Sequence, residues 1–185
     1  MKIVILSPFN TFSIKIKKKI TVILLISMAI LVSVMRYFDS QIQHNDNPNG
    51  IISFELAKNV STSETILNSW DSFSKTAAGI SMGFDFLFLI IYALFIALLV
   101  DITNEYLWKN SKMYTVGIFL IWSVFLAAFF DSIENIALIK LLLGDIKQLW
   151  SSIAYYFATA KFFLLSISIL FIILNSILIL FRKKY

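Results

Sequence analysis

Apolar residues are gathered into four long stretches that are separated by more polar segments. The stretches cover residues 20–38, 80–100, 113–140 and 153–181. About 20 apolar residues in a helix cross the hydrocarbon core of a bilayer, so each stretch is long enough to span a membrane. The pattern predicts an all-α, polytopic integral membrane protein whose four transmembrane helices form a small bundle. We expect residues 1–185 to make a single membrane domain.

The last two stretches are longer than a span requires, and both contain charged side chains. Asp131 and Glu134 interrupt the third stretch, and Lys161 interrupts the fourth. Helices that exceed the hydrocarbon thickness tilt or extend beyond it. We therefore expect these two helices to cross the bilayer at an angle or to protrude from it.

The only sizeable connection, residues 39–79, joins the first two stretches. The composition of its first part predicts a turn at residues 47–50. In its second part, apolar residues recur at spacings typical of one or two amphipathic helices, and Ser61 or Ser63 is a candidate cap of the later helix. We expect this extracytoplasmic segment to lie on the outer surface of the bundle, with Trp70 in the headgroup region.

The composition agrees with a location in the bilayer. Hydrophobic residues make up 59% of the chain and charged residues only 15%, with a mean hydropathy of +0.84, which is too apolar for an ordinary soluble domain. Four spans leave no room for a separate catalytic domain. The absence of cysteine excludes disulfides, thiolate nucleophiles and Cys-ligated metal centres, and the single histidine, His44, argues against a His-rich site.

The flanking cations predict the orientation, because Lys and Arg accumulate on the cytoplasmic side of membrane proteins. The first stretch follows a basic segment, residues 15–19, and no small-residue cleavage site precedes Arg36, which is typical of a retained signal anchor. With four spans, both termini then lie on the cytoplasmic side. The expected location is a plasma membrane or a bacterial inner membrane. Binding of anionic lipid headgroups explains the excess positive charge, and no nucleic-acid partner is expected.

Polar residues from different spans converge on one level of this topology. Asp85 lies about five residues into the second stretch, and the polar segment 131–135 follows roughly 18 apolar residues of the third. Lys161 precedes the apolar run of the fourth stretch, and Arg36 closes the first. All of them fall in the extracytoplasmic third of the bilayer. The predicted cluster comprises Asp85, Asp131, Glu134, Asn135, Lys161 and Arg36, with Glu55 or Trp70 reaching down from the loop.

Charged groups at this depth indicate a structural or functional site, because a carboxylate away from water is costly unless it is paired, protonated or facing a wet cavity. Helical spacing puts Asp131, Glu134 and Asn135 on one face. The leading interpretation of Lys161 is an ion pair with Asp131 or Glu134 that joins the third and fourth helices. Because acids outnumber cations, we expect one carboxyl group to be protonated or to await a cation.

Simpler roles are open for several members of the predicted cluster. Asp85 is well placed to cap a helix that begins near Gly83. Asn135 suits an interhelical hydrogen bond, worth about 0.6 kcal/mol on average, and Arg36 suits an interfacial position. A metal centre built from Asp85, Asp131 and Glu134 is a minor alternative, because magnesium sites usually need further oxygen ligands. No cofactor is expected.

Three classes of function fit this sequence. The first is a non-catalytic structural, assembly or binding component, whose partners are the lipid bilayer and further copies of the chain or another membrane protein. The second is a module that binds or transports a cation, a proton or a lipid headgroup. The third is an intramembrane lipid-modifying enzyme with Asp131 or Glu134 as acid or base and Lys161 as electrostatic stabiliser. The sequence favours a non-catalytic protein, since it contains no specific catalytic motif.

Overall fold

The computed structural model describes residues 6–43 and 47–182, so His44 lies outside the described residues. This part of the chain is all-helical, with six helices and no β-strand. The prediction of an all-α membrane protein with four long apolar helices is confirmed. Those four helices are α1 (Ile14–Asp39), α4 (Ser72–Trp108), α5 (Met113–Leu142) and α6 (Gln148–Arg182), while α2 (Ile51–Glu55) and α3 (Val60–Ser69) are short and lie between α1 and α4.

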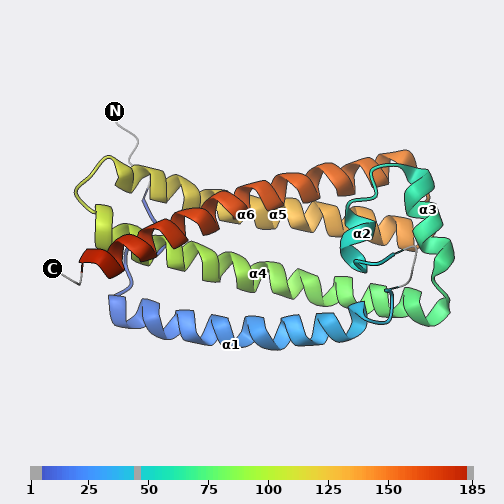
Figure 1. Ribbon diagram of the computed structural model, residues 1–185, viewed down its shortest axis with the longest axis horizontal. Helices are drawn as coiled ribbons and strands as arrows, with labels where there is room; N and C mark the ends of the chain where they lie inside the picture. The colour runs from blue at the N-terminus through green and yellow to red at the C-terminus, as the bar shows by residue number, and fades with distance from the viewer. Residues whose placement is uncertain (1–5, 44–46, 183–185) are drawn as a thin grey trace.

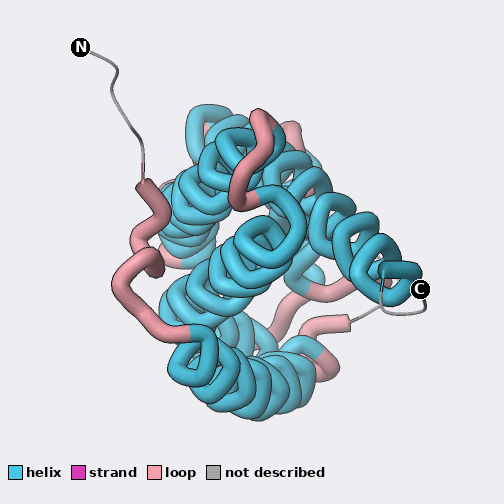
Figure 2. Tube along the Cα trace, turned by 90° about the vertical axis from the view of Figure 1, so that its left-hand side faces the viewer, coloured by secondary structure: helices cyan, strands magenta, loops and turns pink. Residues whose placement is uncertain are grey.

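The four long helices run up and down along one axis, so the start of α1 and the end of α6 lie at the same end of the bundle (Figure 1). The short helices α2 and α3 cover the opposite end. Helices α4, α5 and α6 pack on one another, with α6 crossing obliquely, whereas α1 packs against α4. Seen from one end, the molecule is a bundle of helices (Figure 2).

Each long helix contains one predicted apolar stretch and extends beyond it. The extension is greatest in α4, whose 37 residues correspond to about 55 Å at 1.5 Å per residue, against a hydrocarbon thickness of about 30 Å. Asp71 caps α4 by accepting a hydrogen bond from the Ser74 amide at 2.7 Å. Asp85 therefore lies well inside the helix, and the interpretation of Asp85 as a cap near Gly83 is wrong.

The connection between α1 and α4 contains the predicted turn near residues 47–50. Gly50 has a φ of +58°, a conformation that suits glycine, and the next amide, of Ile51, donates to Asp39 Oδ1 at 2.7 Å. The later helix, α3, is preceded by Asn59, and Ser61 and Ser63 lie inside it. The predicted capping role of these two serines is wrong.

Helices α2 and α3 form a cap on the ends of α4, α5 and α6 and share an apolar core with them. Phe54 of α2 packs edge to face against Trp70, with ring centroids 5.3 Å apart. The Trp70 indole, only 3% exposed, donates to the Ile42 carbonyl at 3.2 Å. The structure thus places Trp70 inside the cap, because α2 folds back and packs against its ring.

Candidate functional site

Lys161 of α6 lies at the centre of a buried cluster of acids. Its Nζ is 2.7 Å from Asp131 Oδ1 and 2.8 Å from Glu134 Oε2, both on α5. Glu55 of α2 approaches to 3.7 Å. All four residues are buried, and Glu134 is completely inaccessible. One ammonium group therefore lies within ion-pair distance of three carboxyl groups from two other helices. The predicted ion pair is part of a larger cluster.

Asp85 joins this cluster through Asn135 rather than through Lys161. The Asn135 Nδ2 donates to Asp85 Oδ2 at 2.6 Å, which links α4 to α5. Among the described residues, no cation lies within ion-pair distance of Asp85. Asp85 is half-buried, whereas the acids around Lys161 are buried. It is the most accessible carboxyl group of the cluster.

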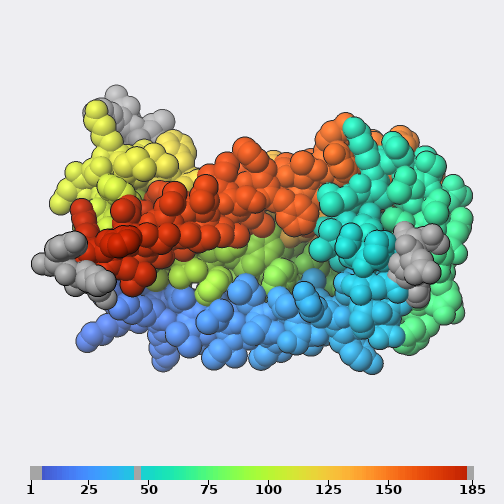
Figure 3. Space-filling view, in the orientation of Figure 1, coloured from blue at the N-terminus to red at the C-terminus, as the bar shows by residue number. Residues whose placement is uncertain are grey.

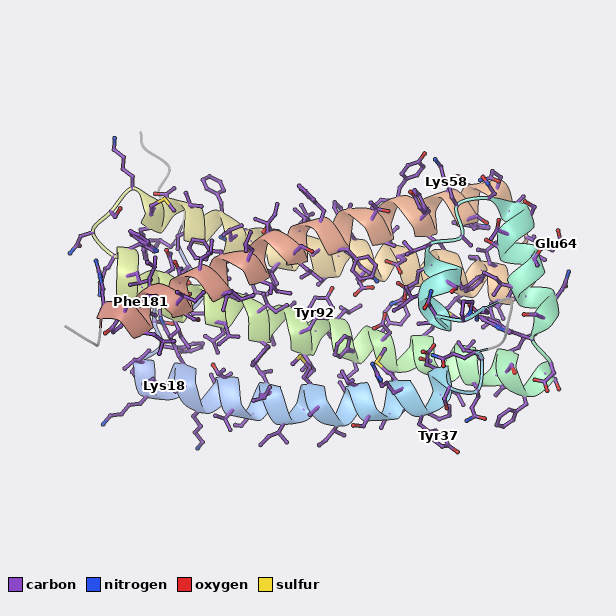
Figure 4. The ribbon with its side chains drawn as sticks, viewed as in Figure 1. Lys18, Tyr37, Lys58, Glu64, Tyr92 and Phe181 are labelled. Carbon is purple, nitrogen blue, oxygen red and sulfur yellow. The ribbon has the colours of Figure 1, made fainter. Side chains whose placement is uncertain are left out.

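Tyr92 belongs to the cluster, although the sequence analysis did not select it. Its hydroxyl donates to Asp131 Oδ2 at 2.8 Å, so Asp131 is held by Lys161 on one oxygen and by Tyr92 on the other. Tyr92 lies near the middle of the bundle (Figure 4). It follows Asp85 by two helical turns and shares its face of α4, and that spacing was the signal in the sequence. The polar cluster of the structure comprises Glu55, Asp85, Tyr92, Asp131, Glu134, Asn135 and Lys161.

The structure does not bring Arg36 and Trp70 into the polar cluster. Arg36 is exposed near the end of α1, and its side chain forms no ion pair with any described residue. Helix α1 packs against α4 rather than against α5 and α6, which carry most of the cluster. Of the two loop residues considered, Glu55 reaches the cluster and Trp70 packs in the cap.

A metal centre at Asp85, Asp131 and Glu134 is not supported. The described residues contain no group of three His, Cys, Asp or Glu side chains that could hold a metal ion. The Lys161 ammonium lies in contact with both Asp131 and Glu134, and Asp85 is turned to the Asn135 amide. The cation that contacts Asp131 and Glu134 is therefore the Lys161 ammonium group.

Glu55 differs from the other acids in coming from the cap rather than from a membrane-spanning helix. Burial raises the pKa of Glu55 to about 7, an effect that Lys161 opposes and the charges of Asp85 and Asp131 reinforce. Near neutral pH this carboxyl group is therefore divided between its protonated and ionised forms. Glu55 is thus the residue through which the cap contacts the polar cluster, and its protonation changes the net charge of that cluster.

A cavity of about 570 Å³ adjoins the polar cluster. Its long walls come from α1, α4 and α6, and residues of α2 and α5 line one end, so we term it the α1–α6 groove. In the space-filling view, α4 is visible in green between α1 and α6 (Figure 3). One end is polar and is lined by Glu55, Asp85, Tyr92, Asp131, Asn135 and Lys161. The remainder is apolar and includes Met28, Phe95, Leu99, Leu165, Ile169 and Ile173.

The groove extends along the helices for more than the depth of one bilayer leaflet. It is lined on α4 from Ser81 to Leu99 and on α6 from Lys161 to Ile173. At 1.5 Å per residue these segments are about 27 Å and 18 Å long, compared with about 15 Å for half of the hydrocarbon core. Ile169 and Ile173 are 43% and 50% exposed, which leaves the groove open along its side.

A second buried charge cluster lies at the other end of the bundle and was missed by the sequence analysis. Lys17 of α1, only 2% exposed, contacts Asp101 at 2.6 Å and Glu105 at 2.7 Å, both on α4. The Ser7 hydroxyl donates to Asp101 at 2.5 Å. The position of Asp101 directly after an apolar run was the available signal. These contacts attach the first turns of α1 to α4.

Comparison with known proteins finds no matching family model, no similar curated protein and no similar solved structure.

Proposed function

We propose that this protein is a non-catalytic membrane protein that binds an amphiphilic molecule in the α1–α6 groove, with the polar end of the ligand at the polar cluster. The observation that carries the proposal is the continuity of the groove from a charged end to long apolar walls. An amphiphile has the same division between a polar head and an apolar chain.

The size and lining of the groove support this function. Small-molecule sites are typically clefts of about 300–1,000 Å³ with mostly apolar walls and a few polar groups, and the α1–α6 groove, at about 570 Å³, falls within this range. The open side of the groove lies between α1 and α6, which we expect to face lipid. A ligand dissolved in the bilayer would enter the groove from the side, without passing through the cap formed by α2 and α3.

The internal pairing of the polar cluster favours binding over catalysis. Lys161 is in contact with Asp131 and Glu134, and Tyr92 donates to Asp131. These side chains already hold one another, so a substrate would have to displace an existing contact to reach an acid or a base. A binding site needs no such displacement, because Asp85 remains half-buried beside the groove.

The proposed location is a plasma membrane or bacterial inner membrane, with both termini in the cytoplasm. The bundle end that holds the start of α1 also carries Lys109, Lys112 and Arg182, and the neighbouring Lys15, Lys18 and Lys19 are exposed. This concentration of cations supports a cytoplasmic position for that end. The cap and the polar cluster would then lie towards the outside.

Native mass spectrometry of the protein released gently from its own membrane tests the proposed function. We expect a co-purifying amphiphile in the wild type and its loss in Ile173→Trp, which fills the apolar part of the groove. Leu174→Trp is the matched control, because Leu174 is 52% exposed, close to the 50% of Ile173, and does not line the groove. Retention of the same ligand by both variants, or the presence of a protein partner and no lipid in all samples, would contradict the proposal and favour an assembly role.

A further inference from the structure

We infer that the α1–α6 groove selects single-chain amphiphiles whose head is a protonated amine and carries no phosphate. This inference depends on the proposed function and adds the class of ligand to it. It follows from the charges at the polar end of the groove, from the place of Asp85 among them and from the aromatic side chains beside it.

The charges at the polar end of the groove are unbalanced. The cluster contains four carboxyl groups and a single ammonium group, that of Lys161. Lys161 is also the only cation among the described residues that line the groove. Buried acids are stabilised by an opposite charge or by protonation. A ligand cation would supply the missing charge, whereas a ligand anion would add to the excess.

Asp85 is the carboxyl group available to such a ligand. It lines the groove, it has no described cation as a partner, and only its Oδ2 accepts a hydrogen bond, from Asn135. Glu134 is fully buried and does not line the groove, while Asp131 is engaged on both oxygens by Lys161 and Tyr92. A charge-assisted hydrogen bond from an ammonium group to Asp85 would be the strongest contact that the groove offers.

Phosphate and carboxylate heads do not match this site. An ammonium group has three N–H donors, and Lys161 already faces Asp131, Glu134 and Glu55. No described cation is left to receive an anion there. Phosphate-bearing lipids, including zwitterionic ones, would place a negative charge among these acids, so the site favours heads that carry positive charge alone.

Aromatic side chains next to Asp85 favour the same ligand class. Phe88, Tyr92 and Phe162 line the polar half of the groove, and Phe162 already lies under the Lys161 ammonium, with Nζ 5.0 Å from the ring centroid. Aromatic faces attract cations through their quadrupole, most strongly where water is excluded. The volume of about 570 Å³ is that of a site for a drug-sized ligand, which suits one alkyl chain.

Equilibrium binding of three probes with the same chain tests the inference. The full-length protein in nanodiscs of phosphatidylcholine would be titrated at neutral pH with radiolabelled hexadecylamine, hexadecan-1-ol and hexadecanoic acid, and empty nanodiscs would give the partitioning background. We expect the amine to bind at least about tenfold more tightly than the alcohol, a difference of about 1.4 kcal/mol, and the acid to bind weakest. This measurement on the wild type does not depend on the folding of a variant.

Two variants assign the selectivity to Asp85. Asp85→Asn is expected to reduce the affinity for the amine to that for the alcohol, while Glu64→Gln, the same charge change on an exposed acid of α3, leaves the preference intact. An amine preference that survives Asp85→Asn would overturn the role of Asp85. Equal binding of all three probes that is lost in Ile173→Trp would overturn the amine selectivity and leave the proposed function standing. Absence of binding by any probe would contradict both.

Discussion

At the scale of single residues, Lys161 lies within ion-pair distance of three buried carboxyl groups, those of Glu55, Asp131 and Glu134. The sequence predicted that acids of the third apolar stretch would meet this lysine, since the acids follow one apolar run and Lys161 precedes the next, antiparallel run. It offered Glu55 or Trp70 as the loop residue of the cluster without deciding between them, because the contact of Glu55 with Lys161 requires α2 to fold back onto the bundle. Tyr92 was missed because its phenol counts as an ordinary apolar residue in a periodicity analysis.

Replacing Lys161 tests the dependence of the acids on its charge. Lys161→Met leaves Asp131 and Glu134 buried without a counter-ion, so we expect a loss of about 3–5 kcal/mol in the free energy of unfolding, measured by denaturant titration in mixed micelles. Lys147→Met is the control, because Lys147 is exposed and pairs only with Asp145, and such surface pairs contribute about 0–1 kcal/mol. Equal losses in the two variants would show that the cluster is not held by Lys161.

The raised pKa of Glu55 predicts a pH dependence of stability. Because the folded state favours the protonated form, the Glu55 contribution is fully present below about pH 4.5 and is lost as the pH rises to about 7. We expect the melting temperature of the wild type in detergent to fall over this window, and Glu55→Gln to lack that component of the fall. Identical pH profiles for wild type and variant would show that Glu55 titrates normally in the folded protein.

At the scale of elements, α1 is the least integrated of the long helices, since it packs mainly against α4 and forms one wall of the groove. The sequence predicted its apolar segment but read residues 15–19 only as a flanking basic segment. The structure divides these lysines by helical position. Lys17 is buried against α4, while Lys15, Lys18 and Lys19 are exposed. The sequence shows how many lysines the segment contains, but which of them forms an ion pair depends on how α1 packs against α4.

Loss of the Lys17 contact is expected to loosen α1. Lys17→Met leaves Asp101 buried without its cation, so amide hydrogen exchange should become faster in the first turns of α1 and in the facing segment of α4. Lys18→Met is the matched control, because Lys18 is the exposed neighbour that points away from the bundle (Figure 4). If both variants exchange like the wild type, the contact does not fasten α1.

The ends of the long helices were not predicted by the apolar pattern. Apolar stretches located all four long helices, but the structure extends α4 on both sides of its predicted span, to Ser72 and Trp108. The added residues include polar side chains such as Asp101 and Asn104, which are buried against neighbouring elements. A hydropathy pattern stops where polar residues begin, whereas a helix continues wherever those residues find partners.

At the scale of the whole molecule, two buried charge layers enclose an apolar belt. Asp85 and Asp101 mark the layers on α4 and are separated by 16 residues, or about 24 Å, which approaches the hydrocarbon thickness of about 30 Å. We therefore expect each layer to lie close to one boundary of the bilayer. The sequence predicted the layer around Lys161 and missed the one around Lys17, because a single acid at the end of an apolar run has no visible partner.

The orientation of the bundle can be tested with single cysteines, since the chain has none of its own. Glu64→Cys places a thiol on the cap, and Lys18→Cys places one at the other end of the molecule (Figure 4). We expect a membrane-impermeant maleimide to label Glu64→Cys in intact cells and to label Lys18→Cys only after permeabilisation. The reverse pattern would put the polar cluster and the groove's charged end on the cytoplasmic side.

Photolabelling with hexadecylamine that carries a diazirine at the far end of its chain tests the occupancy of the α1–α6 groove most directly. With the head at Asp85 and the chain along the groove, we predict adducts on Leu99, Ile169 and Ile173, which line its apolar part, and their suppression by excess unlabelled amine. Adducts found equally on Leu170 and Leu174, which are exposed but lie outside the groove, and unaffected by competitor would contradict the account.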